Sequence, residues 1–169
     1  PERREVIERL VRAGRLQIGP WYVLADAQVP AGESLLRNLA IGRATARLFG
    51  GSAEVLYSPD AFGHPPAWPA LGLEFGITTG ALWRGLGDDP TGNRDLFWWA
   101  APDGRRVLVY HFPPDGYEIG SNLLLPPAQD GVDAALRKAW SRVRGQLLPR
   151  AATRHVALFV GADHHAPSP

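Results

Sequence analysis

Short apolar segments alternate with amphipathic helical segments along this chain, and this order constrains the fold more than any other feature of the sequence. Within the helical segments the apolar residues recur at helical spacing, as Val6, Ile7, Leu10 and Val11 do near the start. The expected helices cover residues 2–13, 33–49, 67–75 and 132–148, and the expected strands cover residues 16–19, 54–57, 77–79, 97–100, 107–112 and 155–160. Strands that alternate with helices favour parallel βαβ units, so the predicted fold class is α/β.

The expected strands 97–100 and 107–112 differ from the others, because they flank Pro102-Asp103-Gly104, a sequence typical of a hairpin turn. No segment inside the chain has the composition of a linker, so one domain is expected. The chain lacks an initiating Met and ends shortly after an apolar strand. We therefore expect residues 1–169 to be an incomplete piece of a larger domain.

Charge and composition narrow the classes of partner. The net charge is +1, from 18 Lys and Arg against 17 Asp and Glu, and no basic block argues for a nucleic acid or a polyanionic surface. No apolar run approaches the roughly 18 residues that a membrane span needs. Since the chain has no cysteine, it has no disulfide framework, thiolate metal site or Cys nucleophile.

Polar side chains follow the expected strands with unusual regularity. Asp26, Asp60 and Arg84 each come after one of the first three strands. Tyr117 and Asp163 follow later ones, with Glu118 and His164 beside them. The carboxyl ends of parallel strands meet at one rim, so we expect these side chains to converge there.

Two carboxylates with aromatic neighbours suit glycoside hydrolysis, in which one carboxylate attacks the anomeric carbon and the other protonates the leaving oxygen. Asp60 and Asp163 are the candidate pair. The aromatic residues that suit the apolar face of a sugar, with core packing as the alternative, are Trp21, Phe62, Trp83 and Tyr117. A plain turn role remains open for both Asp residues, and Arg84 could bind substrate or pair with Asp88.

Three histidines raise the question of a metal. His64, His164 and His165, with Asp nearby, are compatible with zinc. They do not assemble a four-ligand site from the sequence alone, and a His after Gly is more often structural.

The chain resembles glycoside hydrolase family 38, the zinc-dependent α-mannosidases. Its motif sequences are most similar to the bacterial branch of that family, which includes mannosylglycerate-hydrolase-like enzymes. The matching segments occur in the family's order and are Gly19-Pro-Trp-Tyr-Val-Leu-Ala-Asp26, Gly32-Glu-Ser-Leu-Leu-Arg-Asn-Leu39, Pro59-Asp-Ala-Phe-Gly-His64, Phe75-Gly-Ile77, Leu82-Trp-Arg-Gly85, Gly116-Tyr-Glu-Ile119 and Gly161-Ala-Asp-His164. The resemblance implies an N-terminal (β/α)7 barrel, of which this chain would be a part, and a retaining mechanism on an α-mannoside substrate. It also suggests a cytoplasmic bacterial enzyme and leaves the oligomeric state open.

The resemblance also implies roles for particular residues. Asp60 would be the nucleophile and a zinc ligand, Phe62 would line the sugar subsite, and Arg84 would hold the nucleophile or substrate; Tyr117 would touch substrate hydroxyls, and Asp163 would be the general acid/base. The remaining zinc ligands, an upstream His-x-Asp pair and a downstream His, would lie outside this sequence. Where the family's bacterial members carry an acidic residue after Asp26, this chain has Ala27, and no role carries over to Asp26.

Other interpretations remain. One is a catalytically inactive, carbohydrate-binding barrel that keeps the aromatics but has lost the metal. Another is a metal-dependent, carbohydrate-deacetylase-like barrel, which requires a His-x-x-x-His type ligand pair that the sequence lacks. A Rossmann-like domain is disfavoured, because Gly50-Gly51 and Gly85-Leu-Gly87 form no dinucleotide fingerprint after a first strand.

We expect the 169-residue piece, made alone, to hydrolyse no aryl α-mannoside and to aggregate. An incomplete barrel leaves strand edges unpaired, and a metal site with one protein ligand binds zinc weakly. The measurement is mannosidase turnover together with light scattering, and measurable turnover by the isolated piece contradicts the prediction.

Overall fold

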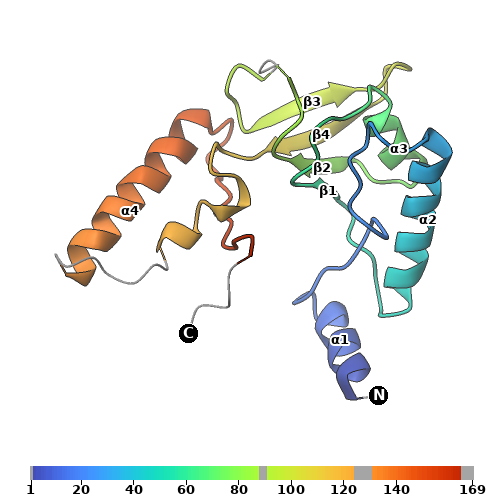
Figure 1. The fold of residues 1–169 in the computed structure, drawn as a ribbon, viewed down its shortest axis with the longest axis horizontal. Helices are drawn as coiled ribbons and strands as arrows, with labels where there is room; N and C mark the ends of the chain where they lie inside the picture. The colour runs from blue at the N-terminus through green and yellow to red at the C-terminus, as the bar shows by residue number, and fades with distance from the viewer. Residues whose placement is uncertain (1, 88–90, 124–130, 165–169) are drawn as a thin grey trace.

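The computed structural model describes residues 2–87, 91–123 and 131–164, and a small sheet lies between its helices (Figure 1). Figure 1 shows α2 and α3 beside the sheet at one side of the molecule and α4 at the opposite side. The helices are α1 (Glu2–Arg12), α2 (Gly32–Arg47), α3 (Trp68–Glu74) and α4 (Val132–Leu147), with short 3₁₀ turns η1 (Gly116–Glu118), η2 (Ser121–Leu123) and η3 (Leu148–Arg150). All four expected helices are present, within two residues at each end.

The sheet has the strand order β1-β2-β4-β3 in the part of the chain that the structure describes. β1 (Leu56–Ser58), β2 (Thr79–Leu82) and β4 (Arg106–His111) are parallel to their neighbours, with Ser58 opposite Leu82 and Leu82 opposite His111. β3 (Leu96–Ala100) runs antiparallel to β4. Helix α3 connects β1 to β2, as the βαβ prediction requires.

The hairpin prediction is confirmed, and the other neighbouring strands of the sheet are parallel, as expected. A turn of a few residues can join only antiparallel strands, so the Pro102-Asp103-Gly104 turn sets β3 against β4 in the opposite direction. The backbone N–H of Arg105 donates to the Asp103 carboxylate at 2.9 Å, and Gly104 has φ +83°, which suits glycine. The fold class is α/β with a mixed sheet. Among the described residues this sheet does not close into a barrel.

Two expected strands are absent from the described sheet. Residues 16–19 and 155–160 form no regular secondary structure and belong to no ladder. A strand needs a neighbour that exchanges hydrogen bonds along it. The Ile18 carbonyl accepts from the N–H of Ala53 at 2.8 Å, and the Phe159 carbonyl accepts from the N–H of Gly120 at 2.8 Å. The apolar pattern identified both segments but not their hydrogen-bond partners.

The main core joins the sheet to α2 and α3. Trp68 and Leu39 are fully buried, and both belong to a cluster whose buried members are Ala27, Leu35, Leu39, Leu56, Trp68, Leu71, Ile77, Leu82, Val107 and Val109. A smaller cluster of Ile119, Val143 and Leu147 anchors α4 to η1 and η2. Burying a large apolar side chain stabilises the fold by roughly 1.5–3 kcal/mol. None of the helices in the described residues is long and apolar enough to cross a membrane.

The loop that leads to Asp26 is tied to α2 by one side chain. Asn38 accepts from the N–H groups of Tyr22 and Val23 at 2.7 and 3.1 Å, and its amide donates to the Val23 carbonyl at 2.8 Å. Close approach of the same loop is possible because Gly42 has no Cβ, which would meet the backbone of Pro20, Trp21 and Tyr22. The loop therefore has one defined path across the helix.

Gly42→Ala should destabilise the protein by about 1–3 kcal/mol, because overpacking against a backbone outweighs the better helix propensity of Ala. Gly145→Ala is the matched control: Gly145 also lies inside a helix, but a Cβ there meets nothing within 4 Å. It should be neutral or stabilising by up to about 1 kcal/mol. Unfolding midpoints measure both in the parent protein, the longer chain of which residues 1–169 are expected to be a piece. Equal shifts for the two variants would contradict the expected packing.

Candidate active site

The candidate site begins where β1 and β2 end. Ser58 and Leu82 lie opposite each other as the last residues of the two strands, so Asp60 and Arg84 sit at the same distance, two residues, beyond them. Arg84 Nε lies 3.2 Å from Asp60 Oδ1, and both side chains are 42% exposed. A half-exposed ion pair of this kind contributes only about 0–1 kcal/mol to stability, so its main effect here is orientation. Asp88, the other partner considered for Arg84, lies outside the described residues.

The Arg84 guanidinium also lies against two aromatic rings. It is 4.0 Å from the centre of the Trp83 ring and 5.5 Å from that of Phe62. Cations are attracted to ring faces, and these contacts hold the guanidinium beside Asp60. Phe62 itself is 66% exposed, so its ring remains available to a ligand.

Trp83 connects this group to Tyr117. The two rings meet edge to face at 5.4 Å, and the indole N–H of Trp83 donates to the Pro114 carbonyl at 3.2 Å. Gly116 permits this contact, because a Cβ there would collide with the Trp83 ring, and its φ of +59° also favours glycine. Trp83 is therefore a support inside the site, and Trp21 packs against the main core.

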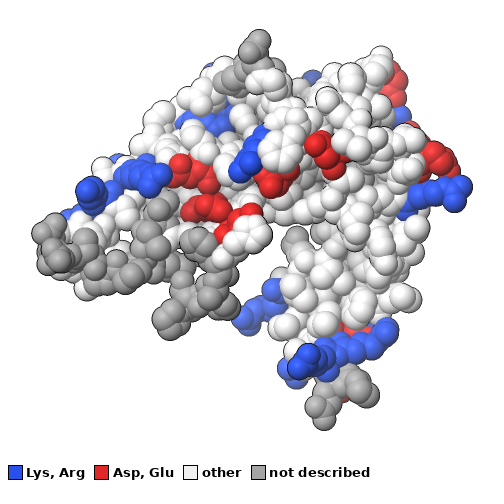
Figure 2. Space-filling model, in the orientation of Figure 1, with Lys and Arg blue, Asp and Glu red and all other residues white. Residues whose placement is uncertain are grey.

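Tyr117 lies among carboxylates. Its pKa is raised, first by burial and then by the negative charges of Asp163, Asp60 and Glu118. Both candidate catalytic carboxylates are thus within electrostatic reach of one hydroxyl. Figure 2 shows acidic side chains gathered near the middle of this face, with basic side chains beside them.

Asp163 reaches the site on the segment that follows residues 155–160. Its backbone N–H donates to Glu118 Oε1 at 3.0 Å, and its Oδ2 lies 3.3 Å from His164 Nε2. The segment is held further by a hydrogen bond from the Ser121 hydroxyl to the Gly161 carbonyl. Five residues expected at the site from the sequence, namely Asp60, Phe62, Arg84, Tyr117 and Asp163, are therefore linked through one network of contacts.

A cavity of about 250 Å³ opens beside Asp60. Its lining residues are Leu24, Ala25, Asp26, Ser58, Pro59, Asp60 and Ala61. Asp26, to which the sequence assigned no role, forms part of the same wall as Asp60. The available signal was that Asp26 follows the apolar segment 16–19, but its approach to Asp60 depends on the loop held by Asn38.

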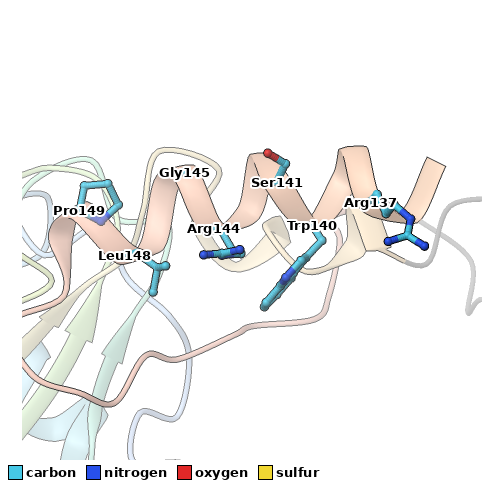
Figure 3. A pocket seen from close by; sticks show the side chains of 7 residues that line it. All are labelled: Arg137, Trp140, Ser141, Arg144, Gly145, Leu148 and Pro149. Atoms are coloured by element: carbon cyan, nitrogen blue, oxygen red, sulfur yellow. The ribbon is translucent and has the colours of Figure 1, made fainter. Parts of the chain in front are cut away.

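A larger hollow of about 460 Å³ lies elsewhere, along α4 and η3 (Figure 3). Its lining residues are Arg137, Trp140, Ser141, Arg144, Gly145, Leu148 and Pro149. It contains no carboxylate and none of the residues expected at the site. Of these two cavities, only the smaller is lined by a residue expected at the site, Asp60.

The histidines have different surroundings. His64 is buried, packs edge-on against Trp68 and Trp99 at 5.7 and 6.0 Å, and places Nε2 3.1 Å from the Arg84 carbonyl. Burial lowers its pKa, only partly opposed by this hydrogen bond and by the charge of Asp26. His164 is almost fully exposed, and His165 lies outside the described residues.

The described residues contain no group of three or more His, Cys, Asp or Glu placed to hold a metal ion. One carboxylate oxygen of Asp60 is paired with Arg84, and the side chain is 42% exposed. Asp60 is chemically suited to be one oxygen ligand of a zinc ion. The part of the chain that the structure describes therefore fits a share of a zinc site and not a complete one.

Comparisons with known proteins point in one direction. The model of the family "Glycosyl hydrolases family 38 N-terminal domain" matches residues 1–169. A putative mannosylglycerate hydrolase of Halalkalibacterium halodurans is 34% identical over 133 residues, which is 70% of this chain and 15% of that protein. An α-mannosidase G of Dictyostelium discoideum is 33% identical over 120 residues, covering 68% of this chain and 11% of that protein.

A solved structure agrees with the sequence comparisons. An α-mannosidase from Enterococcus faecalis V583 superposes with a TM-score of 0.83 at 27% identity, over 97% of this chain and 18% of that one. The chain thus spans less than a fifth of the length of these relatives.

Gly85→Ala should destabilise the site more than Gly87→Ala. Both glycines have positive φ, so both substitutions strain the backbone by about 1–3 kcal/mol. Only at Gly85 would a Cβ also meet backbone, 2.5 Å from Gly63 N and 2.8 Å from Ala61 O, whereas at Gly87 it meets nothing within 4 Å. Hydrogen exchange of residues 59–64 in the parent protein is the measurement. Equal protection in the two variants would show that this contact is not required.

Proposed function

Because the chain belongs to glycosyl hydrolase family 38, we propose that its parent protein hydrolyses α-mannosidic bonds and that residues 1–169 form one piece of its catalytic domain. The proximity of Asp60 and Arg84, which lie just beyond β1 and β2, to Tyr117 and Asp163 is the observation that carries this proposal. We further propose that the four-stranded sheet is part of a (β/α)7 barrel, with the remaining strands contributed by the rest of the parent, and that the enzyme is cytoplasmic.

Asp60 is the proposed nucleophile. Its carboxylate attacks the anomeric carbon while the bond from that carbon to the leaving oxygen breaks, and the product is a covalent glycosyl-enzyme. The Arg84 guanidinium, 3.2 Å from Oδ1, balances the negative charge and leaves Oδ2 free of that ion pair. Asp60 also lines the cavity of about 250 Å³.

Asp163 is the proposed general acid/base. It gives its proton to the leaving oxygen in the first step. In the second step it takes a proton from the water that attacks the anomeric carbon while the bond from that carbon to Asp60 breaks. Each displacement inverts the anomeric carbon, so the two together retain its configuration. A retaining pair requires the two carboxyl groups to be about 5–5.5 Å apart with substrate bound. The contact between the Asp163 backbone N–H and Glu118 Oε1 ties this residue to the same 3₁₀ turn that carries Tyr117.

Substrate binding is assigned to Phe62, Arg84 and Tyr117. The exposed Phe62 ring offers an apolar face, and the Tyr117 hydroxyl and Arg84 guanidinium offer hydrogen bonds to sugar hydroxyls. The cavity of about 250 Å³ is slightly smaller than the roughly 300–1,000 Å³ of pockets for drug-sized ligands. Of the proposed catalytic and binding residues, Asp60 is the one that lines this cavity.

Zinc is the proposed cofactor, with Asp60 as one ligand and the other ligands outside the described residues. When bound, the metal would supply Lewis-acid binding of sugar hydroxyls that assists ring distortion. The other functions of the site follow from this chain's own groups: attack by Asp60, proton transfer by Asp163, and orientation by Arg84 and Tyr117.

In the full-length parent, Asp60→Ala should abolish hydrolysis of an aryl α-mannoside and reduce the zinc content.

Asp163→Ala should lower kcat by about 10²–10⁴ for a substrate with a poor leaving group, because such a group needs the proton. For a dinitrophenyl mannoside, whose leaving group needs no proton, kcat/KM should fall much less. Added azide should restore kcat, because it replaces water in the second step and needs no general base. Steady-state kinetics and metal analysis measure these effects.

Asp133→Ala is the control, since Asp133 is an exposed residue in the first turn of α4 outside the site. It should leave kcat and zinc content unchanged. Turnover that survives Asp60→Ala would overturn the assignment of the nucleophile. A parent that binds mannosides without zinc or turnover would instead support the inactive, carbohydrate-binding alternative.

A further inference from the structure

Two histidines bind consecutive backbone carbonyls just beyond β2. His64 Nε2 lies 3.1 Å from the Arg84 carbonyl oxygen, and His111 Nε2 lies 3.1 Å from the Trp83 carbonyl oxygen. A carbonyl oxygen can only accept, so in both rings Nε2 carries the proton. The two residues held in this way are the ones whose side chains meet Asp60 and Tyr117.

These carbonyls have left the sheet. The last contact of β2 with its neighbour is the bond from the Phe112 N–H to the Leu82 carbonyl at 2.9 Å. Past that point, buried backbone carbonyls must find other donors, because an unpaired one costs about 1–3 kcal/mol. The side chains of His64 and His111 supply the donors for the carbonyls of Arg84 and Trp83.

Each ring is held in turn by its surroundings. Arg150 Nη2 lies 3.2 Å from His111 Nδ1, and since a guanidinium only donates, Nδ1 accepts and the tautomer is set. His64 is only 7% exposed and is fixed by the edge-on contacts with Trp68 and Trp99. Trp68 belongs to the main core, so the position of the His64 ring is coupled to the core.

We propose that His64 is a positioning residue of the active site: it holds the Arg84 backbone so that the Arg84 side chain meets Asp60. Three contacts between the loop 60–64 and residues 84–85 support this. They are the hydrogen bond from His64 to the Arg84 carbonyl, the ion pair of Arg84 with Asp60, and the close approach of Gly85 to the backbone of residues 61–63. The catalytic consequence rests on the proposed function, while the positional consequence does not.

His111 makes an equivalent contact with Trp83, but its Nδ1 also accepts from the buried Arg150. A substitution there would disturb that charge as well. The test is therefore made at His64, in the full-length parent.

The first comparison is between His64→Gln and His64→Leu. A Gln amide nitrogen can occupy the place of Nε2 and donate to the same carbonyl, whereas Leu keeps the bulk and loses the donor. His64→Leu should lower kcat/KM about tenfold, the effect of one lost hydrogen bond. His64→Gln should stay within about threefold of the parent, because the donor is retained.

The deciding measurement is a double-mutant cycle with Arg84→Ala. If His64 acts through Arg84, His64→Leu should change kcat/KM by no more than about twofold once Arg84 is absent, since the two residues act as a unit. Losses that multiply independently in the two backgrounds overturn the proposal. If His64→Leu fails to fold, His64→Asn replaces it, because its shorter side chain does not reach the Arg84 carbonyl.

A crystal structure of the His64→Leu parent separates this inference from the proposed function. The distance from Arg84 Nε to Asp60 Oδ1 should lengthen beyond the 3.2 Å seen here, whether or not the parent turns over mannosides. An unchanged ion pair overturns the positioning role. If the unsubstituted parent is inactive but the ion pair of Arg84 with Asp60 is broken in His64→Leu, only the proposed function is refuted.

Discussion

The parallel register of β1 and β2 is the constraint on which the site depends. Because Ser58 lies opposite Leu82, β1 and β2 end at the same level of the sheet. Asp60 and Arg84 follow at equal offsets, so their side chains meet. A slip of one residue would reverse the facing of every side chain on one strand and separate the pair. Trp68, which fills the space over Gly80 between the strands and α3, helps to fix that register.

Close contacts with the backbone shape the site. Gly85 lies against the backbone of residues 61–63, and Gly116 lies under the Trp83 ring. Neither contact is possible with a side chain at those positions. The hydrogen bonds of His64 and His111 then satisfy carbonyls that the sheet leaves unpaired. The His64 and His111 side chains and the absence of a Cβ at Gly85 and Gly116 thus fix the positions of Trp83 and Arg84. Arg84 in turn orients the carboxylate of Asp60.

The elements with strong periodicity were predictable from the sequence, as the four helices and the hairpin show. Residues 16–19 and 155–160 were not, because their apolar pattern is that of a strand while their hydrogen-bond partners are loops and 3₁₀ turns. The direction of β3 followed from the short turn, against the general expectation of a parallel sheet. Local signals therefore identified segments more reliably than they identified partners.

The sequence by itself identified the candidate site residues: Asp60, Phe62, Arg84, Tyr117 and Asp163 all stand after apolar segments, and the carboxyl ends of parallel strands meet at one rim. Only the tertiary structure decided how they are held. The pairing of Arg84 with Asp60, the place of Asp26 in the cavity wall and the use of His64 and His111 as backbone donors all join residues far apart in the chain. Such contacts depend on the register of the strands and on packing around glycines. Neither can be predicted from the local sequence pattern of one segment.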